Sequence, residues 1–206
     1  MTEEDTKRLV LGFLGSLTAG GVIYLVTRPS SYSISQLVTP EKVAYIAAEL
    51  PQGDDDFAQA ALKWVSDNIQ YQALGSDISF KNGSVLCRGC YTPTSVLAKG
   101  AGNCVAQSFL LTSILRNRID ADRVYATLGE VTIDGVGGHA WTSYWRDGGW
   151  YILDPTYKEA VGKWMPASHP SYLSQVHVND IMVHCEEGAK VCVKKCPACL
   201  RREVAS

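Results

Sequence analysis

Three residues of this chain have the types and the order that a thiol-based acyl-transfer enzyme needs. Cys104 stands where a glycine-containing loop runs into an apolar segment, His139 opens an aromatic stretch, and Asp154 ends the next one. A cysteine, a histidine and an aspartate provide a nucleophile, its base and a group that orients the base. The sequence therefore predicts acyl-transfer chemistry with Cys104, His139 and Asp154 as the catalytic residues.

Each of the three residues also has a structural interpretation when it is taken alone. A lone cysteine is often a buried core thiol, a lone histidine a satisfied core residue, and an aspartate before proline the start of a turn. The order and setting of the three residues favour catalysis. The other histidines are expected to be structural or surface residues: His169, His177 and His184.

The segment from Cys104 to Arg116 predicts the helix that positions the nucleophile. Its apolar residues cover more than one face, which is typical of a helix buried on several sides. A cysteine at the start of a helix faces unpaired backbone N–H groups and the positive end of the helix dipole, which favour the thiolate and can stabilise an oxyanion. Gly100 and Gly102 allow a tight entry of the backbone into this helix.

A β-hairpin is expected to carry the other two residues. Two aromatic-rich runs flank residues 146–149, which have the composition of a tight turn. If Trp145 pairs with Trp150, His139 and Asp154 lie diagonally on one face, roughly 7 Å apart at the backbone. Their side chains can close that distance.

The remaining elements define the fold class. Apolar residues at helical spacing predict helices over residues 39–50 and 54–69, and alternation predicts a strand over 123–133. Residues 71–97 are expected to be irregular. Helices that precede a run of strands indicate an α+β fold with an antiparallel sheet.

Composition and charge indicate a folded protein of ordinary type. The chain has 206 residues, of which 46% are hydrophobic and 19% charged, and its formal net charge is -2. This charge argues against general nucleic-acid binding. We expect four regions: a membrane anchor over residues 1–29, a linker over 30–38, a catalytic domain over 39–182 and a cysteine-rich tail over 183–206.

The amino-terminal region predicts a single-pass membrane protein. The segment from Leu9 to Thr27 carries no charge, and as a helix it would rise about 28 Å, close to the thickness of the hydrocarbon layer. A buried core helix and a cleaved signal peptide are the alternatives. Lys7 and Arg8 precede the segment and Arg28 follows it. This small excess of basic residues favours an amino terminus inside and a catalytic domain outside, but it does not decide on which side of the membrane the catalytic domain lies.

Six further cysteines form a second group. Two C-x-x-C pairs have the ligand spacing of a structural zinc site: Cys87, Cys90, Cys196 and Cys199. A second possible arrangement uses the carboxyl end alone: His184, Cys185 and Cys192. Three disulfides are the competing interpretation, because the number of cysteines is even and the body of the protein can lie outside the cytosol.

Over about residues 60–157 the sequence resembles the transglutaminase-like superfamily, which is circularly related to papain-type cysteine proteases. The matching runs are residues 99–104, 108–116, 121–124, 138–141 and 149–156. The resemblance implies a central cysteine-bearing helix packed on an antiparallel sheet. It also implies that Cys104 is the nucleophile, His139 the general base and acid, and Asp154 the residue that orients the histidine.

The sequence departs from the superfamily pattern at two places. Relatives often carry an acidic residue on each side of the cysteine, where this chain has Asn103 and Val105. No glutamine or tryptophan stands at an obvious upstream position to complete an oxyanion hole.

The superfamily includes transglutaminases, proteases and peptide N-glycanases. Because the chain lacks the added β-domains of animal transglutaminases, we expect a cysteine peptidase or amidase that acts on a protein or peptide. A protein-crosslinking transglutaminase and a catalytically inactive protein-binding module are the alternatives.

Overall fold

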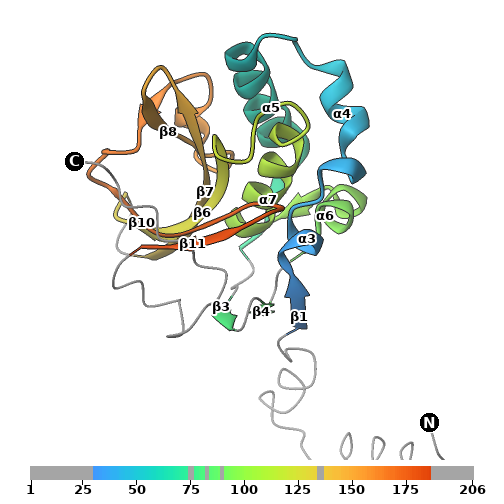
Figure 1. Cartoon of the computed structure of the whole chain (residues 1–206), viewed down its shortest axis with the longest axis vertical. Helices are drawn as coiled ribbons and strands as arrows, with labels where there is room; N and C mark the ends of the chain where they lie inside the picture. Colours follow the sequence, from blue (N-terminus) through green and yellow to red (C-terminus); the bar gives the residue numbers. More distant parts are fainter. Residues whose placement is uncertain (1–29, 74–76, 82–83, 89–90, 134–136, 187–206) are drawn as a thin grey trace, which may run out of the picture.

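One buried helix, α7 (Cys104–Leu115), lies at the centre of the fold. All 12 of its residues are buried, as its apolar pattern predicts. In the computed structural model, which describes residues 30–73, 77–81, 84–88, 91–133 and 137–186, α7 separates a group of helices from a curved antiparallel sheet (Figure 1). It packs against α5 and α6 on one side and against β6 and β7 on the other, so the residue at its start lies where the two layers meet.

The helical layer follows the predicted segments with one interruption. The segment expected over residues 39–50 forms a short 3-10 helix and then an α-helix, and Val43 ends the first and precedes the second. Three acidic residues in the first turn of the next helix favour its start through the helix dipole. A further helix begins at the cap Thr92 in the region expected to be irregular. The helices are α3 (Ile34–Leu37), η1 (Pro40–Lys42), α4 (Ala44–Glu49), α5 (Asp54–Asn68) and α6 (Pro93–Lys99).

Within the described residues, the largest sheet has six strands, and every neighbouring pair is antiparallel. This confirms the α+β class with an antiparallel sheet. In spatial order the strands are β11 (Val183–Cys185), β10 (Tyr172–Val178), β6 (Val124–Val131), β7 (Gly137–Arg146), β8 (Gly149–Leu153) and β9 (Met165–Pro166). Strands β10 and β11 place the carboxyl-terminal part of the domain beside β6, far from it in sequence.

The hairpin of β7 and β8 has the predicted register. Trp145 pairs with Trp150, and Arg146 pairs with Gly149. The two residues of the turn, Asp147 and Gly148, have φ values of 47° and 80°. A two-residue turn with positive φ at both positions matches the twist of the flanking strands, and Asp-Gly is well suited to it.

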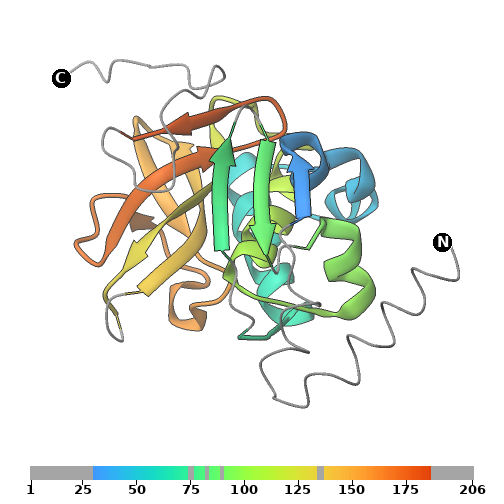
Figure 2. The same ribbon diagram turned by 90° about the horizontal axis from the view of Figure 1, so that it is seen from below.

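Residues 30–38 differ from the linker that the sequence suggests. They form β1 (Ser30–Ser33) and α3, and β1 joins β4 (Ser84–Arg88) and β3 (Asp77–Lys81) in a three-stranded sheet (Figure 2). Leu37 and Val38 are buried in a core cluster with Val85. The segment is therefore part of the domain core, because its few apolar residues find partners that come from distant parts of the chain.

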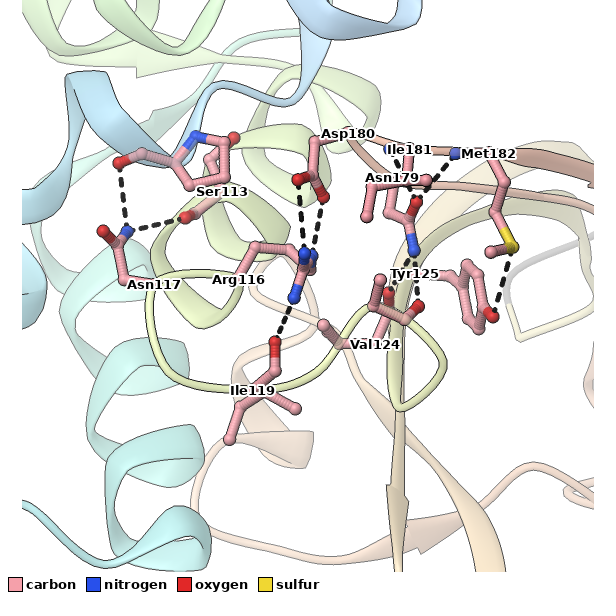
Figure 3. Close-up of polar contacts among 12 residues, drawn as sticks. Ser113, Arg116, Asn117, Ile119, Val124, Tyr125, Asn179, Asp180, Ile181 and Met182 are labelled. Atoms are coloured by element: carbon pink, nitrogen blue, oxygen red, sulfur yellow. Dashed lines mark hydrogen bonds and ion pairs between the residues drawn. The ribbon is translucent and has the colours of Figure 1, made fainter.

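The end of α7 is fastened to the turn between β10 and β11 (Figure 3). The Nε of Arg116 donates to Oδ1 of Asp180 at 2.6 Å, and a second guanidinium nitrogen reaches Oδ2 at 3.2 Å. Arg116 also donates to the carbonyl of Ile119. Nearby, the side chain of Asn179 donates to the carbonyl of Ala121 at 2.6 Å. These part-buried contacts fix the helix relative to the sheet. A guanidinium that donates two parallel hydrogen bonds to one carboxylate, as Arg116 does to Asp180, forms one of the stronger hydrogen-bonded pairs in proteins.

The described part of the chain contains no helix that is long and apolar enough to cross a membrane. The anchor expected over residues 1–29 lies outside the described residues, as does most of the expected cysteine-rich tail.

Candidate active site

Cys104 is the first residue of α7, as the sequence predicts. Asn103 caps the helix, and its Oδ1 accepts from the N–H of Ala106 at 3.0 Å. The short strand β5 (Ala101–Gly102) leads into this cap. Gly102 is needed there because a Cβ at this position would lie 2.9 Å from the Cβ of Ala106. Cys104 is a free thiol and is 9% exposed. As the first residue of the helix, it lies in the turn whose N–H groups the helix cannot satisfy internally.

Hydrogen bonds hold α7 against the strand that carries His139. The hydroxyl of Thr142, on β7, lies 3.2 Å from the hydroxyl of Thr112 and donates to the carbonyl of Ser108 at 3.3 Å. All three residues are buried. Because Thr142 is close to His139 in β7 and Ser108 is one helical turn from Cys104, these contacts set the separation of the two candidate catalytic residues.

His139 and Asp154 meet as the hairpin register requires. Nε2 of His139 lies 2.7 Å from Oδ2 of Asp154. Asp154 follows the end of β8 and is completely buried, while the side chain of His139 is 16% exposed. Since Asp154 occupies Nε2, the other ring nitrogen, Nδ1, remains for Cys104, with which His139 also interacts. The structure thus brings together the three residues that the sequence analysis selected.

The environment of His139 favours its protonated form. Burial on its own lowers the pKa of His139, but hydrogen bonds to Asp154 and Cys104, together with the charges of both partners, raise the pKa to about 10 from an ordinary value of 6.5. Burial raises the pKa of Asp154, but the hydrogen bond and charge of His139 and the hydrogen bonds of Thr156 outweigh it and lower that pKa. A protonated imidazole that Asp154 holds at one ring nitrogen can stabilise negative charge at the other.

Asp154 receives more hydrogen bonds than the sequence analysis anticipates. Its Oδ1 accepts from the backbone N–H and the hydroxyl of Thr156 at 3.0 and 2.8 Å and from the N–H of Tyr157 at 3.3 Å. Its Oδ2 accepts from His139 and from the hydroxyl of Tyr172 at 2.9 Å. The Asp-Pro-Thr run could have indicated the Thr156 contacts, because aspartate often bonds to the backbone two residues on. No local signal indicates Tyr172, which lies on β10.

Aromatic rings surround the His139–Asp154 pair. Trp141, which is 2% exposed, stacks near His139 with ring centroids 6.3 Å apart. It meets Tyr172 edge to face at 5.1 Å. Gly129 of β6, which pairs with His139, leaves the space that Trp141 occupies. This apolar surface screens the hydrogen bond from water and thereby strengthens it.

The space at Gly129 makes a strong prediction for stability. In Gly129→Ala the new Cβ would lie 2.0 Å from the carbonyl oxygen of Leu173 and 2.7 Å from the ring of Trp141. Because the backbone of Leu173 would have to move to relieve this clash, we expect the free energy of unfolding, measured by urea denaturation, to fall by about 3 kcal/mol. Gly137→Ala is the matched control, since nothing lies within 4 Å of its added Cβ. Equal effects of the two substitutions would contradict this account.

Tyr71 is an additional residue at the site that the sequence analysis missed. It ends β2 (Gln70–Tyr71), which pairs in parallel with β5, and Gln107 of α7 supports this pairing by donating to the carbonyl of Gly102 at 3.0 Å. Tyr71 is 52% exposed. Burial of its hydroxyl, followed by the charges of Cys104 and Asp154, raises the pKa of Tyr71. Its hydroxyl therefore stays protonated and can donate a hydrogen bond.

The other histidines lie outside this group of residues. Nδ1 of His177 lies 2.9 Å from the buried hydroxyl of Thr127, and its Nε2 lies 2.9 Å from Glu186. His184 stacks on His177, and His169 packs against Tyr172. These contacts agree with the structural roles expected for them.

The expected zinc ligands lie outside what the structure describes. The side chains of Cys87, Cys90, Cys196 and Cys199 are not among the described ones. Cys185 is disulfide-bonded and so has no thiolate for a metal, which removes the arrangement of His184, Cys185 and Cys192. Among the described residues, no group of three or more histidine, cysteine or acidic side chains is placed to hold a metal ion.

The sequence model of the Transglutaminase-like superfamily matches residues 43–155. The match covers more than half of the chain and includes Cys104, His139 and Asp154. The chain belongs to this superfamily. This transglutaminase-like protein has the buried, cysteine-bearing helix and the antiparallel sheet that the sequence resemblance to the superfamily implies.

Solved structures similar to this transglutaminase-like protein include two of LapG from Legionella pneumophila. One is 18% identical with a TM-score of 0.48 and covers 74% of this chain and 91% of that one. The calcium-bound form is 15% identical with a TM-score of 0.45 and covers 76% and 94%. A Cytophaga hutchinsonii protein described as a candidate cysteine protease is 15% identical with a TM-score of 0.46. The match covers 77% of this chain but only 47% of that protein. No curated protein matches the sequence.

Proposed function

We propose that this transglutaminase-like protein is a cysteine peptidase or amidase that cleaves a protein or peptide through an acyl-enzyme on Cys104. The observation that carries the proposal is the position of His139. Asp154 holds one ring nitrogen of His139, and the other is left for Cys104. Superfamily membership adds support, because its enzymes act on amides through a cysteine thioester or a related step.

In the proposed reaction His139 first acts as an acid and then as a base. The Cys104 thiolate attacks the carbonyl carbon of the amide, and a C–S bond forms as negative charge moves to the oxygen. The C–N bond then breaks while Nδ1 of His139 gives its proton to the leaving nitrogen. Water attacks the thioester as His139 takes its proton, and the C–S bond breaks. The products are an amine and a carboxylic acid, and the thiolate–imidazolium pair is restored.

Two groups are available to stabilise the oxyanion of this reaction. The backbone N–H groups at the start of α7 point toward the end of the helix that Cys104 occupies. The hydroxyl of Tyr71 is a second candidate donor, because Tyr71 pairs with Gly102 in the segment that leads into the same helix. This arrangement offers a donor in place of a glutamine or tryptophan, neither of which stands at an obvious upstream position in the sequence.

Thiol labelling tests the proposal before any substrate is known. Because a thiolate reacts and an ordinary thiol is only a few per cent ionised at pH 7, iodoacetamide should alkylate Cys104 about ten-fold faster than it alkylates glutathione. Peptide mapping by mass spectrometry follows the site, and Cys104→Ala is the control. A rate equal to that of glutathione would favour the catalytically inactive binding module.

Casein cleavage then identifies the acceptor of the acyl group. Hydrolysis should release peptides with the wild-type protein and none with Cys104→Ala. If a labelled primary amine were incorporated into casein instead, an amine would replace water in the second step and the protein would be a crosslinking transglutaminase.

We propose further that residues 1–29 anchor the protein in a membrane as a single span. The uncharged segment from Leu9 to Thr27 supports this location. Recovery of the full chain with membranes after a carbonate wash, and its release on removal of residues 1–29, would test the anchor. Recovery of the full chain in the carbonate supernatant would contradict it. Protease protection of the catalytic domain in sealed vesicles would give its side.

A structural zinc ion is proposed at the two C-x-x-C pairs: Cys87, Cys90, Cys196 and Cys199. Their spacing supports a tetrahedral thiolate site. The disulfide at Cys185 favours the competing interpretation, in which the cysteines pair with one another. Metal analysis of the purified protein together with a free-thiol count would separate the two, since a zinc site requires one metal ion and four reduced cysteines, whereas disulfides require neither.

A further inference from the structure

The two oxygens of the Asp154 carboxylate accept hydrogen bonds from different kinds of donor. Oδ1 accepts from Thr156, through both its N–H and its hydroxyl, and from the N–H of Tyr157. Oδ2 accepts from Nε2 of His139 at 2.7 Å and from the hydroxyl of Tyr172 at 2.9 Å. The oxygen that faces the imidazole is therefore shared with a second donor.

The contacts on Oδ1 already fix the orientation of the carboxylate. Because a carboxylate is planar, holding Asp154 by its backbone and by Oδ1 also sets the place of Oδ2. Thr156 and Tyr157 lie two and three residues after Asp154 in a tight turn, so their donors are held by local backbone geometry. The hydroxyl of Tyr172 is thus not needed to place Oδ2, and its main effect falls on the charge that Oδ2 presents.

The surroundings of Tyr172 hold its hydroxyl in place as a donor to Oδ2 of Asp154. It is 7% exposed, and its ring meets Trp141, His139 and His169. Burial, followed by the charge of Asp154 and the hydrogen bond to it, raises the pKa of the Tyr172 hydroxyl, which therefore remains a donor at neutral pH. In this apolar setting a hydrogen bond to a charged oxygen is stronger than in water.

We propose that Tyr172 acts on His139 through Asp154: it shares Oδ2 of Asp154 with His139 and thereby limits how strongly Asp154 holds the protonated imidazole. The inference rests on the proposed role of His139 as the proton carrier. Without this limit, the negative charge on Oδ2 would bind the imidazolium more tightly. The proton needed by the leaving nitrogen would then be harder to release.

Other titratable groups around the pair remain unchanged in the test. Cys104 of α7 and Tyr71 of β2 interact with the pair itself, whereas Tyr157 and His169 interact with Tyr172. The hydroxyl of Tyr172 donates directly to Oδ2, so a change confined to this hydroxyl isolates its effect.

The test is the titration of His139 in Tyr172→Phe, which keeps the ring and removes the hydroxyl. NMR spectra of protein with ¹⁵N-labelled histidine, assigned by comparison with His139→Gln, give the midpoint directly. Loss of the donor makes Asp154 a stronger acceptor, so the midpoint should rise by about half to one pH unit, a three- to ten-fold gain in proton affinity. Replacing Tyr172 with difluorotyrosine, a stronger donor, should lower it.

Tyr144→Phe is the matched control, because Tyr144 is also buried and its hydroxyl donates to an aspartate, Asp55, at 3.2 Å, but the residue lies away from the site. It should leave the midpoint of His139 unchanged. An unchanged or lower midpoint in Tyr172→Phe would overturn the proposal, since a residue that only packs or only places Asp154 predicts one of those results. The titration does not depend on turnover. A slow-reacting Cys104 would therefore refute the proposed peptidase while leaving this result interpretable.

Discussion

Replacing His139 with alanine is expected to lower the rate of peptide cleavage by about 10⁴-fold or more. The substitution removes the group that stabilises the Cys104 thiolate and the proton that the leaving nitrogen needs, so both chemical steps lose their acid–base partner. The loss should equal that of Cys104→Ala within experimental error, because residues that act as a unit are not additive. Casein or peptide cleavage under single-turnover conditions measures both variants and the double variant.

His184→Ala is the control for this prediction, since His184 lies on the edge strand β11 and stacks on His177 away from Cys104. It should retain activity within about two-fold. Full activity in His139→Ala would contradict the assignment of His139 as base and acid.

The charge of His139 should also appear in the pH dependence of stability. Its pKa is raised in the folded protein to about 10 from 6.5, so the folded state binds a proton more tightly than the unfolded state. The resulting stabilisation is complete below pH 6.5 and is lost as the pH rises toward 10. In urea unfolding, the difference between wild type and His139→Gln should therefore shrink over this interval. A constant difference would mean that His139 is neutral in the fold.

Substitution of Asp154 is expected to have the second largest effect, on activity and stability together. Asp154 is completely buried and accepts five hydrogen bonds. Asp154→Ala leaves these donors without an acceptor and a buried imidazolium without its partner, so we expect the free energy of unfolding to fall by about 3–5 kcal/mol. Turnover should fall by about 10² to 10⁴-fold, somewhat less than for His139, because Cys104 and His139 remain.

Asp154→Asn separates the two effects. The amide oxygen can keep the contacts with Thr156 and Tyr157, but the amide nitrogen would face His139 and cannot accept its proton. Stability should therefore suffer less than in Asp154→Ala, while activity falls by a similar factor. Asp67→Ala is the control, because its carboxylate is 56% exposed and should contribute less than about 0.5 kcal/mol. An active Asp154→Asn protein would contradict an orienting role for the carboxylate.

Local sequence signals account for much of the fold that positions the site. The cap at Asn103 and the apolar residues after it specify a buried helix with Cys104 at its start. The Asp-Gly turn fixes the register of the β7–β8 hairpin, and that register brings His139 to Asp154. These features depend on neighbouring residues, whose geometry a sequence pattern can express.

Contacts between distant segments were not predictable in the same way. Leu37 and Val38 lie in a stretch that reads as a polar linker, yet both are buried beside Val85. Their burial depends on the pairing of β1 with β4, which joins segments far apart in sequence. A short stretch with few apolar residues has no period that could reveal such a partner.

By itself the sequence determined which three residues are the catalytic candidates, Cys104, His139 and Asp154, and an α+β fold with an antiparallel sheet, because caps, turns and periodicity are local. Only the tertiary structure decided what surrounds them: Tyr172 on Asp154, Trp141 in the space over Gly129, and Tyr71 beside the helix start. These neighbours come from β10, β7 and β2. Their approach is set by the packing of whole strands, which no single stretch of sequence encodes.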